Sequence, residues 1–207
     1  MGRGRSAGYE DQRDLILARA AALFARGGYP GTSMNQVAEA CGLSKATLYH
    51  YYRDKYALLV NIAEAHVTRL QAIVRETLAT QARPEAQLRT LVARLVEEYT
   101  GAQDAHRVLT EDVKFLGDAD RRRILDQERE VVRGFAEVVA ALRPDLRDAA
   151  MSKPLTMLLF GMVNWLFTWM KPDGPIDHDA MAPIVADLFL GGIGAVQAPA
   201  TRRGLSS

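Results

Sequence analysis

The stretch that decides the fold is residues 33–52, SMNQVAEACGLSKATLYHYY. Its pattern predicts two short helices separated by a tight turn. Ala38 stands where two steeply crossing helices come closest, and a larger side chain there would push them apart. Gly42 stands just past the first helix, where a residue without Cβ most easily adopts the left-handed backbone conformation. This spacing predicts a helix-turn-helix whose second helix enters the DNA major groove, although spacing alone is shared with structural helical hairpins.

A longer run, residues 28–59, GYPGTSMNQVAEACGLSKATLYHYYRDKYALL, resembles the tetracycline-repressor (TetR) family of bacterial transcription regulators. The resemblance covers about residues 11–60 and is most specific from Thr32 to Leu59. Three residues depart from the usual pattern without changing the fold: Cys41 replaces Ala, Ala46 replaces a common Gly, and Tyr52 replaces Phe. The resemblance implies an all-α homodimer of about nine helices, with a three-helix DNA-binding head and a helical body that binds a small-molecule effector.

The residues expected to contact double-stranded DNA lie in and around the two motif helices. Ser33 can offer its hydroxyl and the neighbouring backbone N–H groups to a phosphate. The methyl group of Ala46 can touch a thymine methyl, but the second helix has no arginine to read guanine, so the operator sequence is not predicted. The resemblance implies a phosphate contact for Lys55 and a core position for Tyr52. The predicted DNA-binding set is Ser33, Lys45, Ala46, Thr47, Tyr49, His50, Tyr51 and Lys55. Core packing is the alternative for Tyr51, and a solvated charge is the alternative for the two lysines.

Composition and charge agree with a folded chain that meets an anion at one end. The 207 residues are 48% hydrophobic and 25% charged, which excludes disorder of the whole chain. The formal net charge is +1, but residues 1–55 carry more bases than acids and the remainder carries more acids than bases. A basic head on a mildly acidic body indicates an anionic partner for the head. With one cysteine, Cys41, the chain forms no intramolecular disulfide and no multi-cysteine zinc site.

Breaks and periodicity predict helices throughout and no sustained strand pattern. The expected helices span about residues 11–27, 34–41, 45–52, 55–81, 84–101, 104–116, 119–142, 146–170 and 178–196. Pro154 is expected to kink or split the 146–170 helix, and Pro183 to lie in the first turns of the last helix. The expected domains are 1–54 for DNA binding, 55–197 for ligand binding and dimerisation, and a disordered tail at 198–207. Residues 1–9 are expected to be disordered as well.

The apolar run Leu155–Met170 is too short to span a membrane, which takes about 20 apolar residues. The first residues, Met1–Asp14, have charges and no apolar stretch of the kind found in secretory signals. We therefore expect a cytoplasmic protein without a membrane partner.

No catalytic constellation is visible in the body. His50, His66, His106 and His178 are scattered, and neither a nucleophile motif nor a phosphate-binding glycine loop is present. We expect a protein that is not an enzyme and that uses no cofactor or metal. The alternatives from other functional classes are a helical enzyme and a helical scaffold that does not bind DNA. A gel shift with the DNA flanking the gene separates a DNA-binding regulator from both.

The last two expected helices predict a dimer interface. Leu155–Met170 is apolar nearly all round, so it needs cover on two sides. Residues 178–196 place apolar side chains at helical spacing. Pairing both helices with their symmetry mates gives a four-helix interface, so the operator should be a palindrome. The predicted interface residues are Leu166, Met181, Ile184, Val185, Leu188 and Phe189.

The effector prediction starts from residues 160–169, FGMVNWLFTW, where Asn164 is a polar group on an apolar helix and needs a partner. This segment resembles the eighth helix of TetR-type regulators of fatty-acid, phenylacetate and steroid catabolism, which implies an acyl-coenzyme A effector. The predicted ligand-binding residues are Tyr99, Phe115, Met157, Phe160, Gly161, Asn164, Trp165 and Trp169. Bases expected to meet the coenzyme phosphates are Arg107, Lys114 or Arg121 to Arg123. Dimer core is the alternative for the aromatic residues, and an uncharged aromatic or drug-like molecule is the alternative effector.

Overall fold

The computed structural model describes residues 7–148, 150–170 and 176–198. Residues 1–6 of the expected N-terminal tail and residues 199–207 of the expected C-terminal tail lie outside the described residues. The expectation of a disordered segment at residues 1–9 is wrong for residues 7–9, because they belong to the first helix, α1 (Ala7–Gly27). The described chain is all-α, as predicted, with ten α-helices and one short 3₁₀ helix.

The helices pack into two compact units. The first takes the chain up to Gln71 together with Tyr99–Glu128, and the second takes Ala72–Glu98 and the chain from Arg129 onward. Three long helices, α4 (Lys55–Ala79), α5 (Pro84–Gly101) and α7 (Asp118–Leu142), each contribute to both units. The predicted boundary between the DNA-binding and ligand-binding domains, residue 54, therefore does not coincide with the boundary between the two compact units. The first unit continues along α4 as far as Gln71.

The two motif helices begin where the sequence offers side-chain caps. α2 (Met34–Ala40) starts with a capping box: the backbone N–H of Gln36 donates to Ser33 Oγ over 3.3 Å, and the N–H of Ser33 donates to Gln36 Oε1 over 2.8 Å. α3 (Lys45–Tyr51) is capped by the Ser44 hydroxyl, which accepts from the N–H of Thr47 over 3.1 Å. Gly42 between them has φ of +65°, which confirms the left-handed turn.

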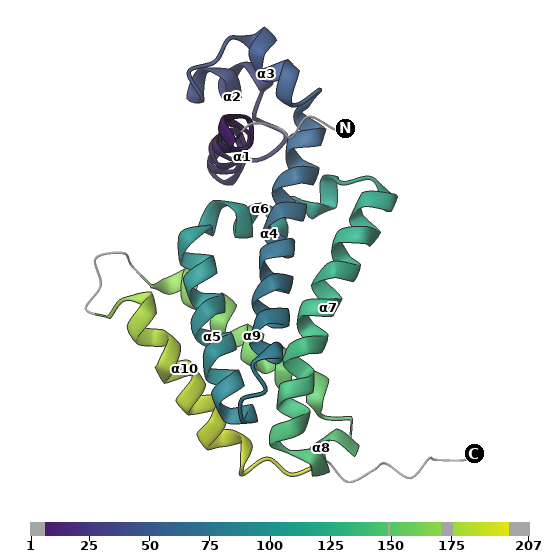
Figure 1. The fold of residues 1–207 in the computed structure, drawn as a ribbon, viewed down its shortest axis with the longest axis vertical. Helices are drawn as coiled ribbons and strands as arrows, with labels where there is room; N and C mark the ends of the chain where they lie inside the picture. Colours follow the sequence, from purple (N-terminus) through teal and green to yellow (C-terminus); the bar gives the residue numbers. More distant parts are fainter. Residues whose placement is uncertain (1–6, 149, 171–175, 199–207) are drawn as a thin grey trace. The chain divides into compact units, whose positions relative to one another are not determined.

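The first unit is built around α1. This helix packs on α2 and on α6 (Gln103–Glu111), while α2 packs on α3 (Figure 1). Phe24 of α1, Val37 of α2 and Leu48 of α3 are all at most 1% exposed. These side chains fix the two motif helices against α1. The short 3₁₀ helix η1 (Val113–Phe115) follows α6.

The second unit contains the C-terminal parts of α4 and α7 and most of α5, together with α8 (Pro144–Asp148), α9 (Ser152–Trp169) and α10 (His178–Ile193). Its core includes Leu88, Leu91, Phe135 and Leu159. Gly134 lets α7 approach α4 closely, because a Cβ at this position would collide with the side chain of Val74. α9 and α10 pack on each other.

Two expected helices end differently in the structure. The 146–170 helix is divided into α8 and α9, but the break precedes Pro154, which sits in the first turn of α9 where its missing N–H removes no helical hydrogen bond. The 104–116 helix stops at Glu111 and tightens into η1. Pro183 lies in the early turns of α10, as predicted. Among the described residues no helix is both long and apolar enough to cross a membrane.

Candidate functional site

The predicted recognition helix presents its polar side to solvent. Lys45, Ala46, Thr47, Tyr49 and His50 are all exposed on α3. One side chain of the same helix, Leu48, is completely buried and anchors the opposite side. Five of the eight predicted DNA-binding residues are therefore exposed on one helix, and Ser33 is exposed at the start of α2.

Contacts within this surface orient two of the predicted side chains. The hydroxyl groups of Ser44 and Thr47 are hydrogen-bonded over 2.7 Å. The ammonium group of Lys45 lies 5.9 Å from the centroid of the Tyr49 ring, one helical turn away. Both contacts are exposed, so DNA can replace either at small cost.

The two neighbouring tyrosines at the end of α3 have different environments. Tyr52 is only 3% exposed, which confirms its core position, and the Arg13 guanidinium lies 5.5 Å from its ring centroid. Tyr51 is half-buried and stacks on Tyr9 of α1 with 4.9 Å between ring centroids. Packing thus accounts for part of the Tyr51 surface and leaves the rest accessible to solvent, so the predicted phosphate contact stays a prediction. Tyr9 was missed because the sequence placed it in a tail.

Lys55 has a structural role that the sequence did not indicate. Its ammonium group donates hydrogen bonds to the carbonyl oxygens of Tyr29 over 2.7 Å and of Pro30 over 3.2 Å. It also lies 4.5 Å from the centroid of the Tyr29 ring. An ammonium group has three N–H donors, so one remains for a phosphate. Lys55 therefore holds the turn between α1 and α2.

Aromatic contacts join the first helices to the segment around η1. Phe115, predicted to bind the ligand, packs at 5.4 Å against Tyr29 of the α1–α2 turn. The Tyr56 hydroxyl donates to Asp120 Oδ2 over 2.7 Å and accepts from the N–H of Gly117 over 3.0 Å. The hydrogen bond to the Asp120 carboxylate raises the pKa of Tyr56. These contacts tie the start of α4 to the start of α7 within the first unit.

A histidine pair lies between α4 and α6. His66 is completely buried, and its Nε2 is 3.3 Å from His106 Nδ1, so one ring donates to the other according to tautomer. Tyr99, predicted to bind the ligand, stacks on His106 with 3.7 Å between centroids. Burial, followed by the nearby His66, lowers the pKa of His106 to about 4. The pair was missed because its members are far apart in the chain.

The predicted ligand-binding residues are divided between the two compact units. Tyr99 and Phe115 belong to the first unit, and the other six lie on α9 in the second. Phe160 is buried against Phe135, with 4.8 Å between ring centroids. The remaining α9 residues are exposed: Met157, Gly161, Asn164, Trp165 and Trp169. Trp165 and Trp169 are 63% and 54% exposed, so a pocket enclosing them would need a further surface.

The predicted dimer residues divide in a similar way. Leu166, Val185 and Phe189 are buried inside the protomer, at 3%, 3% and 7% exposed, and have almost no area left for a partner. Leu188 and Ile184 are exposed, at 65% and 39%, and Met181 is half-buried. The sequence found the apolar positions of α10, but their i, i+3, i+4 spacing does not say which ones face the protomer's own core.

Three helices that share a buried core and expose one face of the last helix are typical of helix-turn-helix DNA-binding regulators. Comparison with known protein families identifies the family of regulators to which this chain belongs. Residues 16–62 match the family described as "Bacterial regulatory proteins, tetR family", and residues 81–193 match "Tetracyclin repressor-like, C-terminal domain". The chain belongs to the TetR family of transcriptional regulators, whose members are DNA-binding proteins rather than enzymes.

Full-length relatives and solved structures agree. The transcriptional repressor KstR2 of Rhodococcus jostii is 25% identical over 91% of this chain and 94% of its own length. A TetR-family regulator from Bordetella parapertussis is 35% identical, covers 92% of this chain and all of its own, and superposes with a TM-score of 0.83. AibR, solved with isovaleryl coenzyme A and operator DNA, is 24% identical over 86% of this chain and 97% of its own, with a TM-score of 0.74.

Proposed function

We propose that this protein is a homodimeric repressor that binds a palindromic operator and leaves it when an acyl-coenzyme A thioester binds the body. The observation that carries the proposal is the exposed α3 face described above, which presents five predicted DNA-contacting residues on a helix anchored by Leu48. A dimer places two such helices in successive major grooves, which is why the operator should be a palindrome.

Exposed apolar side chains on α9 and α10 support the dimer. Large hydrophobic residues on these two packed helices are well exposed in the protomer: Leu158, Trp165, Trp169, Ile184 and Leu188. Apolar surface of this kind is unusual on a monomer and typical of protein–protein contact. We assign this surface, here called the α9/α10 face, to a four-helix contact between two copies. The buried Leu166, Val185 and Phe189 support it from beneath.

Two observations favour a thioester as the effector. AibR, which shares this fold, binds isovaleryl coenzyme A, and the α9 segment resembles that of acyl-coenzyme A-responsive regulators. The exposed α9 residues then contact the ligand only after a second copy covers them, which fits the 63% exposure of Trp165. On this proposal Gly161 and Asn164 lie where a ligand and the partner helix meet.

Bases for the coenzyme phosphates are present on exposed helix faces. Arg107 is paired with Glu111 over 3.0 Å, and Arg123 with Glu64 over 3.0 Å and Asp120 over 2.9 Å. These exposed ion pairs are worth little, so a phosphate can replace them. Lys114 is exposed as well. Release follows if the thioester binds more tightly to a head spacing that does not fit adjacent grooves.

The rival effector is an uncharged aromatic or drug-like molecule, which needs no basic rim. A gel-shift titration of the operator complex with acyl-coenzyme A thioesters of increasing chain length, the matching free acids and hydrophobic drugs separates the two. We expect release by thioesters, with a chain-length optimum. Release by drugs or free acids but never by a thioester would overturn the proposal. A chain that never shifts the DNA flanking its own gene would overturn the DNA-binding part.

A further inference from the structure

We propose that a cleft beside α1 in the first unit is a second small-molecule site, which takes an amphipathic monocarboxylate. The cleft measures about 530 Å³ and is lined by residues of α1, α4 and the segment that joins α5 to α6. A volume of this size is in the range of small-molecule pockets. All of its walls belong to the first unit. It contains none of the residues assigned above to the acyl-coenzyme A effector.

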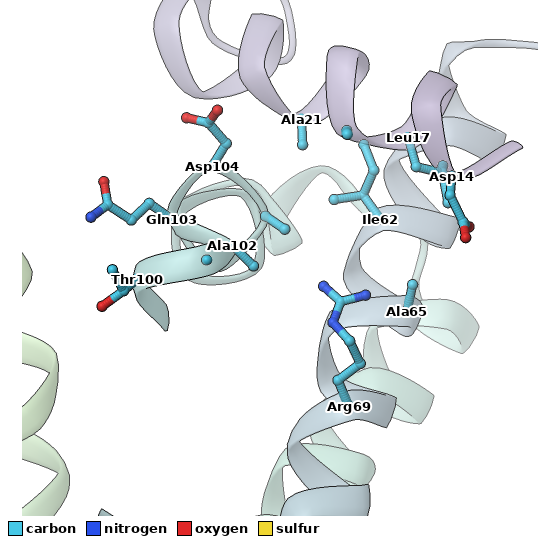
Figure 2. Close-up of a pocket in the computed structure, with 13 residues that line it drawn as sticks. Asp14, Leu17, Ala21, Ile62, Ala65, Arg69, Thr100, Ala102, Gln103 and Asp104 are labelled. Atoms are coloured by element: carbon cyan, nitrogen blue, oxygen red, sulfur yellow. The ribbon is translucent and has the colours of Figure 1, made fainter. Parts of the chain in front are cut away.

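One wall of the cleft is apolar and made largely of small side chains. Leu17, Ala18 and Ala21 come from α1, and Ile62 and Ala65 come from α4. In Figure 2 the side chains of Leu17, Ala21 and Ile62 lie across the space between α1 and α4. Such a wall can accept an alkyl chain or a ring, because short side chains leave room for one.

The polar end of the cleft is provided by Arg69. Figure 2 shows its guanidinium reaching from α4 toward the space between α1 and α6. One guanidinium nitrogen, Nη2, lies 3.4 Å from His66 Nδ1, which steadies the side chain in this direction. A guanidinium presents a planar fork of donors that matches a carboxylate. An anionic group placed here would therefore be held in a defined orientation.

The start of α6 forms the remaining wall. Its N-cap residue is Ala102, which makes no side-chain capping hydrogen bond, and Gln103, Asp104 and Ala105 follow along the cleft. Backbone N–H groups at such a helix start add a weak preference for an anion. This contribution is secondary to Arg69, since Asp104 stands in the same turn.

The charges lining the cleft disfavour a dianion. Asp14 and Asp104 also line it, and Figure 2 places their carboxylates at opposite ends, with Asp104 pointing away from the guanidinium. One arginine with two carboxylates in the vicinity does not favour the double charge of a phosphate monoester. A carboxylate on an apolar body of modest size fits both the charge and the wall.

Five alanines line the cleft, so methyl NMR of the protein labelled at alanine reports on it directly: Ala18, Ala21, Ala65, Ala102 and Ala105. Titration with hexanoate, octanoate and decanoate, without DNA or thioester, should shift these methyl signals saturably. The uncharged methyl octanoate should bind at least tenfold more weakly. Alanines of the second unit, such as Ala136 and Ala140, should not respond.

Variants assign the site to the cleft. Arg69→Gln should raise the Kd for octanoate at least tenfold, while Arg75→Gln, an exposed arginine further along α4, should leave it unchanged. Ala18→Leu should block the cleft without disturbing the fold, because Ala18 is exposed. Unaltered octanoate binding in both Arg69→Gln and Ala18→Leu, or signals that shift only in the second unit, would overturn the inference.

An occupant of the cleft touches α1 of the head and α6 together, so we expect it to change operator affinity. In a gel shift, octanoate should change the operator Kd of the wild type at least threefold and that of Ala18→Leu not at all. Saturable binding without any change in operator affinity would limit the cleft to binding and overturn its regulatory role. The NMR titration uses neither thioester nor DNA, so its result is independent of the acyl-coenzyme A response.

Discussion

At the scale of single residues, Lys55 combines an observed structural contact with a predicted DNA contact. The same ammonium group that the family resemblance assigns to a DNA phosphate already closes the α1–α2 turn through two carbonyl oxygens. A substitution at this position therefore changes two measurable quantities. To separate the effect on stability from the effect on DNA affinity, Lys55 has to be compared with a lysine that makes no hydrogen bonds to backbone carbonyl oxygens.

Lys55→Ala should lower the free energy of unfolding by about 1–2 kcal/mol, because two charge-assisted hydrogen bonds and a cation–π contact disappear. It should also weaken DNA binding about equally for all sequences and reduce the salt slope by roughly one. Chemical denaturation and a salt titration check the two effects. Lys45→Ala is the matched control, since Lys45 is exposed and should affect binding without affecting stability. A Lys55→Ala protein that binds DNA like the wild type would remove Lys55 from the interface.

Ser33 allows its capping and phosphate roles to be separated. Ser33→Ala should cost about 1 kcal/mol of stability, because the capping box of α2 is lost. Ser33→Asp keeps a good N-cap but brings a carboxylate toward the phosphate, so it should retain stability and lose DNA affinity. Thermal melts and gel shifts of both variants check this. If Ser33→Asp bound the operator as tightly as wild type, Ser33 would be a cap only.

Residue roles set by local sequence were predictable, and those set by distant partners were not. Gly42 needs its left-handed backbone because of the turn itself, and Tyr52 follows from its place in the motif. The Tyr9–Tyr51 stack and the His66–His106 contact join residues about 40 positions apart. No periodicity signals such pairs, because they depend on how α1 and α6 pack in three dimensions.

At the scale of elements, α6 connects the head to the rest of the first unit. It packs on α1 and carries His106, whose ring lies between Tyr99 of α5 and His66 of α4. The expected continuous helix over residues 104–116 would have made this connection longer and straighter. Its end at Glu111 and the tightening into η1 place Phe115 against Tyr29 instead. Hydrophobic spacing continued past this point, which is why sequence alone extended the helix.

The histidine pair predicts how stability depends on pH. In the folded protein the pKa of His106 is lowered to about 4, whereas an unfolded histidine titrates near 6.5. Between these values the unfolded chain binds more protons, so stability falls as the pH is lowered from about 6.5 toward 4, by at most about 1.4 kcal/mol per pH unit. His106→Phe keeps a ring against Tyr99 but cannot titrate, so its stability should fall less steeply in this range. Urea unfolding at several pH values checks this. Parallel profiles for the two proteins would contradict it.

At the scale of the whole molecule, the exposed apolar residues of the α9/α10 face support the proposed dimer. The sequence predicted that α9 needs cover on two sides, and the structure gives its own core as one of them: Leu159, Val163 and Leu166 are at most 3% exposed. The other side of α9 carries Trp165. Together with the face of α10 that carries Leu188, it forms the surface that we assign to the partner copy. Which apolar positions belong to which side is a property of the packed protomer, and the predicted interface residues Val185 and Phe189 are buried within it, at 3% and 7% exposed.

Leu188→Arg tests the dimer. Leu188 is 65% exposed in the protomer, so arginine there should leave the fold intact while placing an unpaired charge in the proposed apolar contact. The variant should be monomeric in light scattering and melt like the wild type under conditions where the dimer is dissociated. Its operator affinity should drop by a factor on the order of 100 or more, because one head binds without the effective concentration that a linked second head provides. Leu15→Arg is the matched control: Leu15 is 41% exposed on α1, outside the α9/α10 face, so that variant should remain a dimer. A Leu188→Arg protein that stays dimeric would place the interface elsewhere, and the contact of Trp165 with both a ligand and a partner helix would fall with it.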